Sequence, residues 1–107
     1  VFEMNQFDMA NEPDISYPFL YNFIKGHEYK TQQRVNDLMQ TYFKNTPDGL
    51  PGNDDTGTMS SWYIFASMGI YPIIPAHTTY AVFQPEFDKI TIHLNPKFQL
   101  YYLEEVF

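Results

Sequence analysis

The hydrophobic positions of this chain recur at helical spacing in three segments, residues 14–24, 28–43 and 59–68. The second segment has the clearest amphipathic pattern, because polar residues separate its apolar stripe. That stripe consists of Val35, Leu38, Met39, Tyr42 and Phe43. The third segment is apolar on most sides, so we expect a buried helix that Gly69 ends. Pro18 is compatible with the first helix only if it lies in the first turn.

After Pro72 the pattern becomes typical of β-strands. The segments 79–83, 89–94 and 98–103 are rich in β-branched and aromatic residues with partial alternation, and Asn95-Pro96-Lys97 reads as a turn between the last two. The sequence therefore predicts an α+β chain. Its helical segment covers residues 1–72, and its β-strand segment covers residues 73–107.

A short link at Gly26-His27 predicts that the first two helices form an antiparallel hairpin. The loop before the first helix and the loop after the second then lie at the same end of the hairpin. The second of these loops, residues 45–57, holds three Gly, two Pro, two Asn and three Asp, so it is neither helix nor strand.

Both loops are rich in oxygen ligands. The first carries Asn11 and Glu12, and the second carries Asn53, Asp54 and Asp55. Carboxylates in a rigid loop suit general acid–base chemistry or a hard cation, and oxygen ligands without cysteine favour calcium over zinc. The alternative is an ordinary helix start, because Asp and Thr are common N-cap residues.

Composition excludes several classes of function. The net charge of −7 over 107 residues argues against nucleic acid and against anionic membrane surfaces. There is no cysteine, and no apolar run approaches the roughly 20 residues that span a bilayer. The chain begins at Val1, and we interpret it as a piece of something longer. Its aromatic residues, ten Phe, nine Tyr and one Trp, either fill a core or stack on sugar.

Several motifs, in order and spacing, resemble glycoside hydrolase family 92 from about Asp8 to Leu94. They are Asn11-Glu12-Pro13, Pro18-Phe19-Leu20-Tyr21-Asn22, the run from Asn45 to Gly57, Met59-Ser60-Ser61-Trp62-Tyr63 and Gly69-Ile70-Tyr71-Pro72. The resemblance implies a calcium-dependent exo-α-mannosidase that inverts anomeric configuration. It also implies that the helical hairpins belong to an (α/α)6 toroid and that the strands belong to a β-sandwich-type domain.

The resemblance also implies roles for individual residues. Asp55 matches the general base, and Asn53 stands at a position that is often acidic in relatives, where it would share in catalysis. Asn11, Glu12 and Asp55 are expected around calcium. Asp54 is expected either to contact substrate or to stabilise the loop, and Trp62 is expected to contact substrate.

The general acid of the family is a Glu in an upstream stretch that this sequence does not contain, so we expect the isolated chain to be inactive. The expected partners are mannose-containing glycans and either the remainder of the parent polypeptide or a second copy. The resemblance favours a secreted or periplasmic location. Two alternatives stay open: a non-catalytic, calcium-stabilised carbohydrate-binding piece, and a purely structural fragment.

Overall fold

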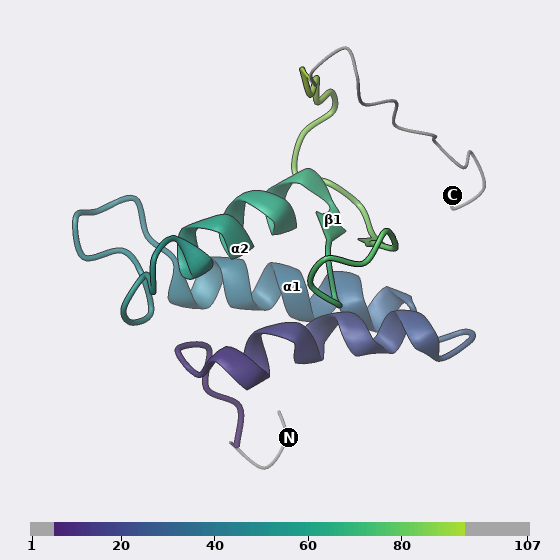
Figure 1. Ribbon diagram of the computed structural model, residues 1–107, viewed down its shortest axis with the longest axis horizontal. Coiled ribbons are helices and arrows are strands. Elements are labelled where there is room, and N and C mark those ends of the chain that lie inside the picture. The colour runs from purple at the N-terminus through teal and green to yellow at the C-terminus, as the bar shows by residue number, and fades with distance from the viewer. Residues whose placement is uncertain (1–5, 94–107) are drawn as a thin grey trace.

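The computed structural model describes residues 6–93, which form three helices and a two-stranded antiparallel sheet (Figure 1). The elements in chain order are η1 (Glu12–Phe23), α1 (Tyr29–Tyr42), α2 (Thr58–Met68), β1 (Ile70–Tyr71) and β2 (Ala81–Val82). The α+β order predicted from the sequence is therefore present. Within the described range, no helix has the length and apolarity needed to cross a membrane.

The first helix, η1, is a 3₁₀ helix that starts two residues earlier than expected. Pro18 lies in its interior, so the prediction that Pro18 belongs to the first turn was wrong. The tighter 3₁₀ helix directs each N–H to the carbonyl three residues earlier, which for position 18 is Ile15. Proline has no such N–H, and the indole Nε1 of Trp62 donates to the Ile15 carbonyl instead, at 2.9 Å.

The amphipathic helix α1 confirms the helix predicted over residues 28–43. Its buried positions, Thr31, Val35, Leu38 and Met39, form one stripe at helical spacing. Figure 1 shows η1 and α1 side by side with their connection at Gly26, and α2 packed on α1 from the other side. Gly26 has a φ of 83°, which glycine adopts without strain. The predicted antiparallel hairpin is thus confirmed.

The third helix, α2, ends at Gly69 in the left-handed conformation, as predicted. The expectation that it is buried on most sides was wrong. Met59, Trp62 and Ala66 are buried, whereas Tyr63 is 39% exposed and Ile64 is 57% exposed. Only one stripe of an apolar helix can face α1 and the core, so the remaining apolar residues stay on the surface of the described part.

The sheet is a short antiparallel pair in which Ile70 lies opposite Val82 and Tyr71 opposite Ala81. The strand predicted over residues 79–83 is confirmed at its centre, whereas β1 was not predicted. The strand predicted over 89–94 was wrong for residues 89–93, which pair with no strand in the described range. Leu94, the strand 98–103 and the turn 95–97 lie outside the described residues. The expected boundary between residues 72 and 73 falls between the two paired strands.

Aromatic rings fill the core between the helices and the sheet. Phe19 stacks on Tyr71 at 4.0 Å and packs against Phe83 at 5.5 Å between ring centroids. Burial raises the pKa of Tyr71 to about 12. Phe19 and Trp62 are almost fully enclosed. Core filling is therefore the role of these rings.

Candidate active site at the loop end

The two oxygen-rich loops meet at the end of the molecule opposite the Gly26 connection (Figure 1). A Cβ atom placed on Gly52 would lie 2.8 Å from the Cβ of Ala10, so the two loops are in direct contact. The convergence that the hairpin predicts is therefore confirmed at this point. Only glycine fits at position 52 without moving one loop away from the other.

Asp54 holds the start of α2. Its Oδ1 accepts the backbone N–H of Ser60 at 2.7 Å, and its carbonyl accepts the N–H of Met59 at 3.1 Å. The side chain is half-buried. This geometry is that of a helix-capping carboxylate, which satisfies N–H groups that no carbonyl of the helix can reach. Of the two roles expected for Asp54, the loop-stabilising one agrees with these contacts.

Asp55 lies in an unusual stretch of backbone. Asp55, Thr56 and Gly57 have φ values of 48°, 57° and 97°, three left-handed residues in succession. Each non-glycine residue in this conformation costs roughly 1–2 kcal/mol. The Asp55 carbonyl accepts hydrogen bonds from the Thr58 N–H at 3.3 Å, from the Thr58 hydroxyl at 2.8 Å and from the Thr56 hydroxyl at 2.6 Å. These bonds hold the strained turn.

The side chain of Asp55, in contrast to its backbone, is exposed. No hydrogen bond engages its carboxylate within the described part of the chain. The adjacent Asn53 is also exposed. The loop thus fixes the backbone of Asp55 and leaves the carboxylate free to bind a cation or to accept a proton.

Two carboxylates hold the first loop in shape. Asp14 Oδ2 accepts the N–H of Asp8 at 2.9 Å, and Asp8 Oδ1 accepts the N–H of Ala10 at 2.9 Å. The second contact, from an Asp side chain to the backbone N–H two residues later, is the bond that makes Asp favourable in turns. The presence of Asp at position 8 was therefore a sequence signal for a turn here. The side chains of Asn11 and Glu12 are exposed and make no hydrogen bond within residues 6–93.

The side-chain oxygens of these loops that make no hydrogen bond in the described part are of the kind that calcium binds, but they are fewer than calcium needs. The Glu12 and Asp55 carboxylates and the carbonyl oxygen of the Asn11 amide are the oxygen ligands that a hard cation requires, whereas calcium takes six to eight of them. Among residues 6–93, no group of three or more His, Asp or Glu side chains is arranged to hold a metal ion. Asn11, Glu12 and Asp55 would supply only part of the six to eight oxygen ligands that calcium takes.

Trp62 does not lie on the surface of this site. It is 1% exposed, and its ring is stacked on Phe43 at 5.5 Å with 5° between the planes. A ring with so little accessible surface presents no face to a sugar. The substrate contact expected for Trp62 has no support from this position.

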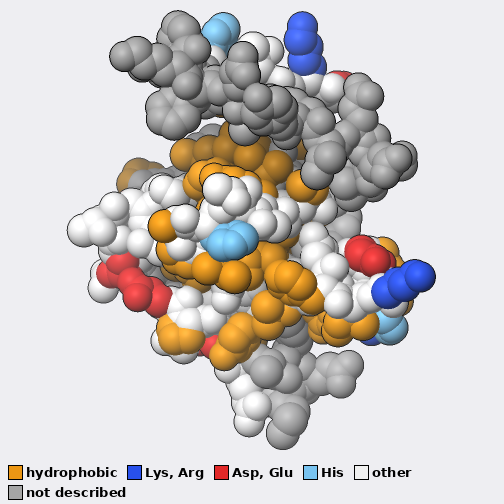
Figure 2. Space-filling model, turned by 45° about the vertical axis from the view of Figure 1, so that its right-hand side comes forward, with side chains coloured by type: hydrophobic (Ala, Val, Ile, Leu, Met, Phe, Trp, Pro, Cys, Tyr) orange, Lys and Arg blue, Asp and Glu red, His pale blue; other side chains and the backbone are white. Residues whose placement is uncertain are grey.

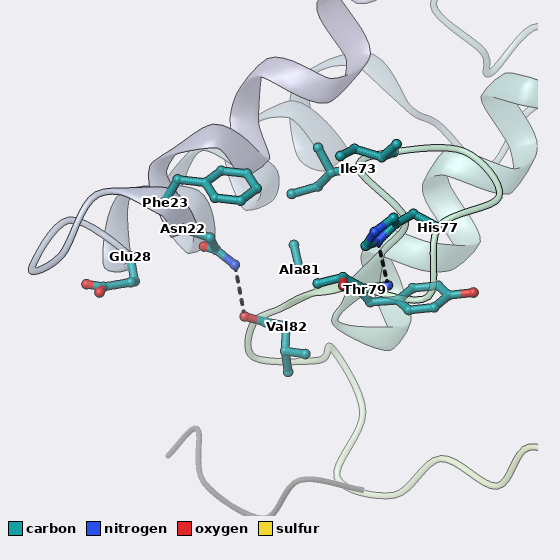
Figure 3. Close-up of a pocket in the computed structure, with 10 residues that line it drawn as sticks. Asn22, Phe23, Glu28, Ile73, His77, Thr79, Ala81 and Val82 are labelled. Atoms are coloured by element: carbon teal, nitrogen blue, oxygen red, sulfur yellow. Dashed lines mark hydrogen bonds between the residues drawn. The ribbon is translucent and has the colours of Figure 1, made fainter. Parts of the chain in front are cut away.

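A concave region lies at the opposite end of the molecule, between the end of η1 and the β1–β2 connection (Figure 3). The cavity measures about 480 Å³, and its walls include Phe23, Ile73 and Ala81. Of the ten residues that line it, Glu28 is the only carboxylate. Hydrogen bonds from its own backbone N–H and from that of Gly26 lower the pKa of Glu28. The cavity thus offers one carboxylate and the His77 imidazole, whereas several acidic side chains lie on the two loops that touch at the other end.

Figure 2 is turned so that the cavity end of the molecule comes forward. Hydrophobic side chains gather over the middle of the surface in this view. Asn22 donates its side-chain N–H to the Val82 carbonyl at 3.3 Å and thereby connects η1 to β2 beside the cavity. His77 Nδ1 accepts the Thr79 N–H at 3.2 Å. Asn22 and His77 thus both bond to the backbone at this end.

Residues 1–101 match the model of the glycosyl hydrolase family 92 catalytic domain. An uncharacterized secreted glycosidase of Arthroderma benhamiae is 34% identical over 84 residues. That alignment covers 78% of this chain and 11% of the relative.

Solved structures give the same result. The family GH92 α-mannosidase BT3965 of Bacteroides thetaiotaomicron, determined in complex with mannoimidazole, superposes with a TM-score of 0.67 at 39% identity. The match covers 71% of this chain and 10% of that protein. A second structure of the same enzyme gives a TM-score of 0.66.

The chain belongs to glycosyl hydrolase family 92. It spans about a tenth of the length of the relatives that it matches.

Proposed function

We propose that the chain is part of a calcium-dependent exo-α-mannosidase that removes terminal mannose from glycans with inversion, with an α-1,2-like preference. The observation that carries this proposal is the match of residues 1–101 to the family 92 catalytic domain. The 39% identity to an α-mannosidase supports the choice of sugar. In this proposal η1, α1 and α2 contribute to an (α/α)6 toroid, and the strands contribute to an adjoining β-sandwich-type domain.

Asp55 is the proposed general base. Inversion requires a carboxylate that removes a proton from a water molecule while a separate acid protonates the leaving oxygen. The Asp55 carboxylate is exposed and carries no internal hydrogen bond among the described residues, which leaves it free to accept that proton. Asn53 is proposed to orient the water, because an amide can hydrogen-bond water but cannot take up its proton.

Asn11, Glu12 and Asp55 are the proposed protein ligands of calcium. Calcium, when bound, would engage the mannose 2- and 3-hydroxyls and favour the distorted ring of the transition state. The chain contributes oxygen donors from two loops that touch at Ala10 and Gly52, and the Asp8–Asp14 hydrogen bond holds the first loop. The same loops then orient the hydroxyls and position the base.

The general acid is proposed to be a Glu outside this chain, so the isolated chain should release no mannose. The exposed apolar side chains of the chain support the proposal that further protein covers part of its surface. Phe23 is 68% exposed, and Ile64 and Ile74 are each 57% exposed. We propose that the remainder of a longer polypeptide, or failing that a second copy, covers them.

The description of one relative as secreted supports a secreted or periplasmic location.

Hydrolysis of an α-mannobioside by the parent enzyme, followed by proton NMR, tests this function. The first sugar product should be β-mannose, since an inverting enzyme delivers water to the opposite face. A chelator should abolish the activity, and added calcium should restore it. Initial release of α-mannose would contradict inversion, and full activity in the chelator would contradict the calcium requirement.

A further inference from the structure

The carbonyl of Ile15 is the acceptor in η1 that Pro18 leaves without its backbone donor. At the two ends of this helix the 3₁₀ pattern is regular: Asp14 donates to Asn11 at 2.9 Å, and Ile24 donates to Tyr21 at 3.1 Å. The corresponding donor for Ile15 would be the N–H of residue 18, which proline lacks.

Trp62 replaces that donor from another helix. Its Nε1–H donates to the Ile15 carbonyl at 2.9 Å across 47 residues of sequence. Phe43 stacks on one side of the indole, and Phe19 packs against it at 6.0 Å and 54°. Because the ring is 1% exposed and packed by two other rings, the direction of its N–H is fixed.

This hydrogen bond lies between the two halves of the proposed site. Ile15 follows Glu12 by three residues on η1, and Trp62 follows Asp55 by seven residues, in the second turn of α2. Since η1 packs mainly along α1, the indole is a direct polar connection from η1 to α2. A shift of Trp62 would move the Asn11–Glu12 loop relative to Asp55.

We propose that Trp62 is a positioning residue, which sets the placement of the Asn11–Glu12 loop against Asp55 through its bond to Ile15 and does not touch substrate. The inference rests on the proposed function of those loops. A displacement of about 1 Å between catalytic groups can lower turnover by about a hundredfold. A purely structural role for the indole predicts a loss of stability, with turnover falling only as the protein unfolds.

Pro18 provides the means to separate the two roles. Pro18→Ala restores a backbone N–H three residues after Ile15, so the carbonyl keeps a partner even without the indole. This substitution cannot restore the connection from η1 to α2. Trp62→Phe should therefore lower the melting temperature less in the Pro18→Ala background than in the wild-type background, while its effect on turnover should be the same in both.

The experiment measures kcat, KM and melting temperature of the parent enzyme with Trp62→Phe, Pro18→Ala and the double variant. Tyr63→Phe is the matched control, because it removes a hydroxyl from the neighbouring aromatic of the same helix. Should Trp62→Phe fail to fold, benzothienylalanine at position 62 keeps the shape of the ring and removes only the N–H. Hydrogen–deuterium exchange of residues 8–15, referenced to Val35 and Leu38 in α1, reports on the loop independently of activity.

We expect Trp62→Phe to lower kcat at least tenfold in both backgrounds and to leave KM within about threefold. Exchange over residues 8–15 should accelerate severalfold relative to α1, and Tyr63→Phe should leave kcat unchanged. Wild-type kcat in Trp62→Phe, or a kcat loss that shrinks together with the stability loss in Pro18→Ala, would overturn the proposal. If the parent hydrolyses no α-mannoside, the proposed function fails, whereas unchanged exchange over residues 8–15 overturns the positioning role itself.

Discussion

The two ends of the helical hairpin have opposite surfaces. At the loop end, two polar loops touch through Gly52 and Ala10, and the backbone at Asp55 is left-handed. At the cavity end, apolar side chains such as Phe23 and Ile74 are exposed around an open cavity of about 480 Å³. The loop end thus presents polar groups on a backbone of defined conformation. The cavity end presents exposed apolar area, which favours contact with protein.

The loop end also shows that a high density of carboxylates does not by itself define a site. Asp8, Asp14 and Asp54 each accept a backbone N–H and hold the loops in shape. The carboxylates of Glu12 and Asp55 do neither in the described part of the chain, and both side chains are exposed. The informative property of each acid is therefore whether the protein already uses its oxygens.

Replacing the free carboxylate should have the largest effect. Asp55→Asn in the parent enzyme should lower kcat at least about a hundredfold, the scale expected when a positioned proton acceptor is lost. Asp54→Asn keeps an amide oxygen that can cap α2, so it should retain most of the turnover. Asp54→Ala should lower the free energy of unfolding by about 0.5–2 kcal/mol. Steady-state kinetics and thermal unfolding of the three variants measure these effects.

The reverse order, in which Asp54→Asn abolishes turnover and Asp55→Asn retains it, would show that the two acids have been assigned the wrong roles. It would also break the rule that the hydrogen-bonded carboxylate is the structural one.

Two glycines, one at each end, sharpen the comparison. Gly52→Ala should lower kcat about tenfold, because the new Cβ would clash with Ala10 and separate the loops. Gly26→Ala meets nothing within 4 Å, so only its φ of 83° is penalised, by about 1 kcal/mol of stability. Kinetics and melting curves measured side by side distinguish these effects. Equal loss of kcat in both variants would mean that the loop contact has no special role in catalysis.

The smallest effect concerns pH and the half-buried Tyr71. The folded state raises the pKa of Tyr71 to about 12 from its ordinary value of 10.0. The stability that the neutral Tyr71 contributes is therefore fully present below pH 10 and is lost as pH rises toward 12. Denaturant unfolding at pH 9, 10 and 11 should show this decline. Tyr71→Phe has no proton to lose, so its decline should be smaller, and an identical decline would contradict the assignment.

Local features of the fold could be predicted from the sequence. The apolar stripe around Val35 and Leu38 identified α1, and the turn formers of residues 45–57 identified the loop before α2. Both signals are local, so neighbouring residues suffice to determine the structure. The meeting of the loops followed from hairpin geometry alone.

Non-local features could not be predicted. The 3₁₀ form of η1 was not predicted, and the donor to its Ile15 carbonyl, Trp62, lies 47 residues away in the sequence. The strand β1 exists because Ala81–Val82 pairs with it, and residues 89–93 lack such a partner in the described range. In the candidate site, residue type identified the acids at both loops. Only their hydrogen bonds separated Asp54 from Asp55, and only packing showed that Trp62 is buried.

The most direct test of the account is the separation of the Glu12 and Asp55 carboxyl groups in a crystal structure of the parent enzyme grown with calcium. The account predicts that both groups lie within one coordination sphere or its water layer, no more than about 10 Å apart. A separation well beyond that distance would contradict the claim that the two loops form one site.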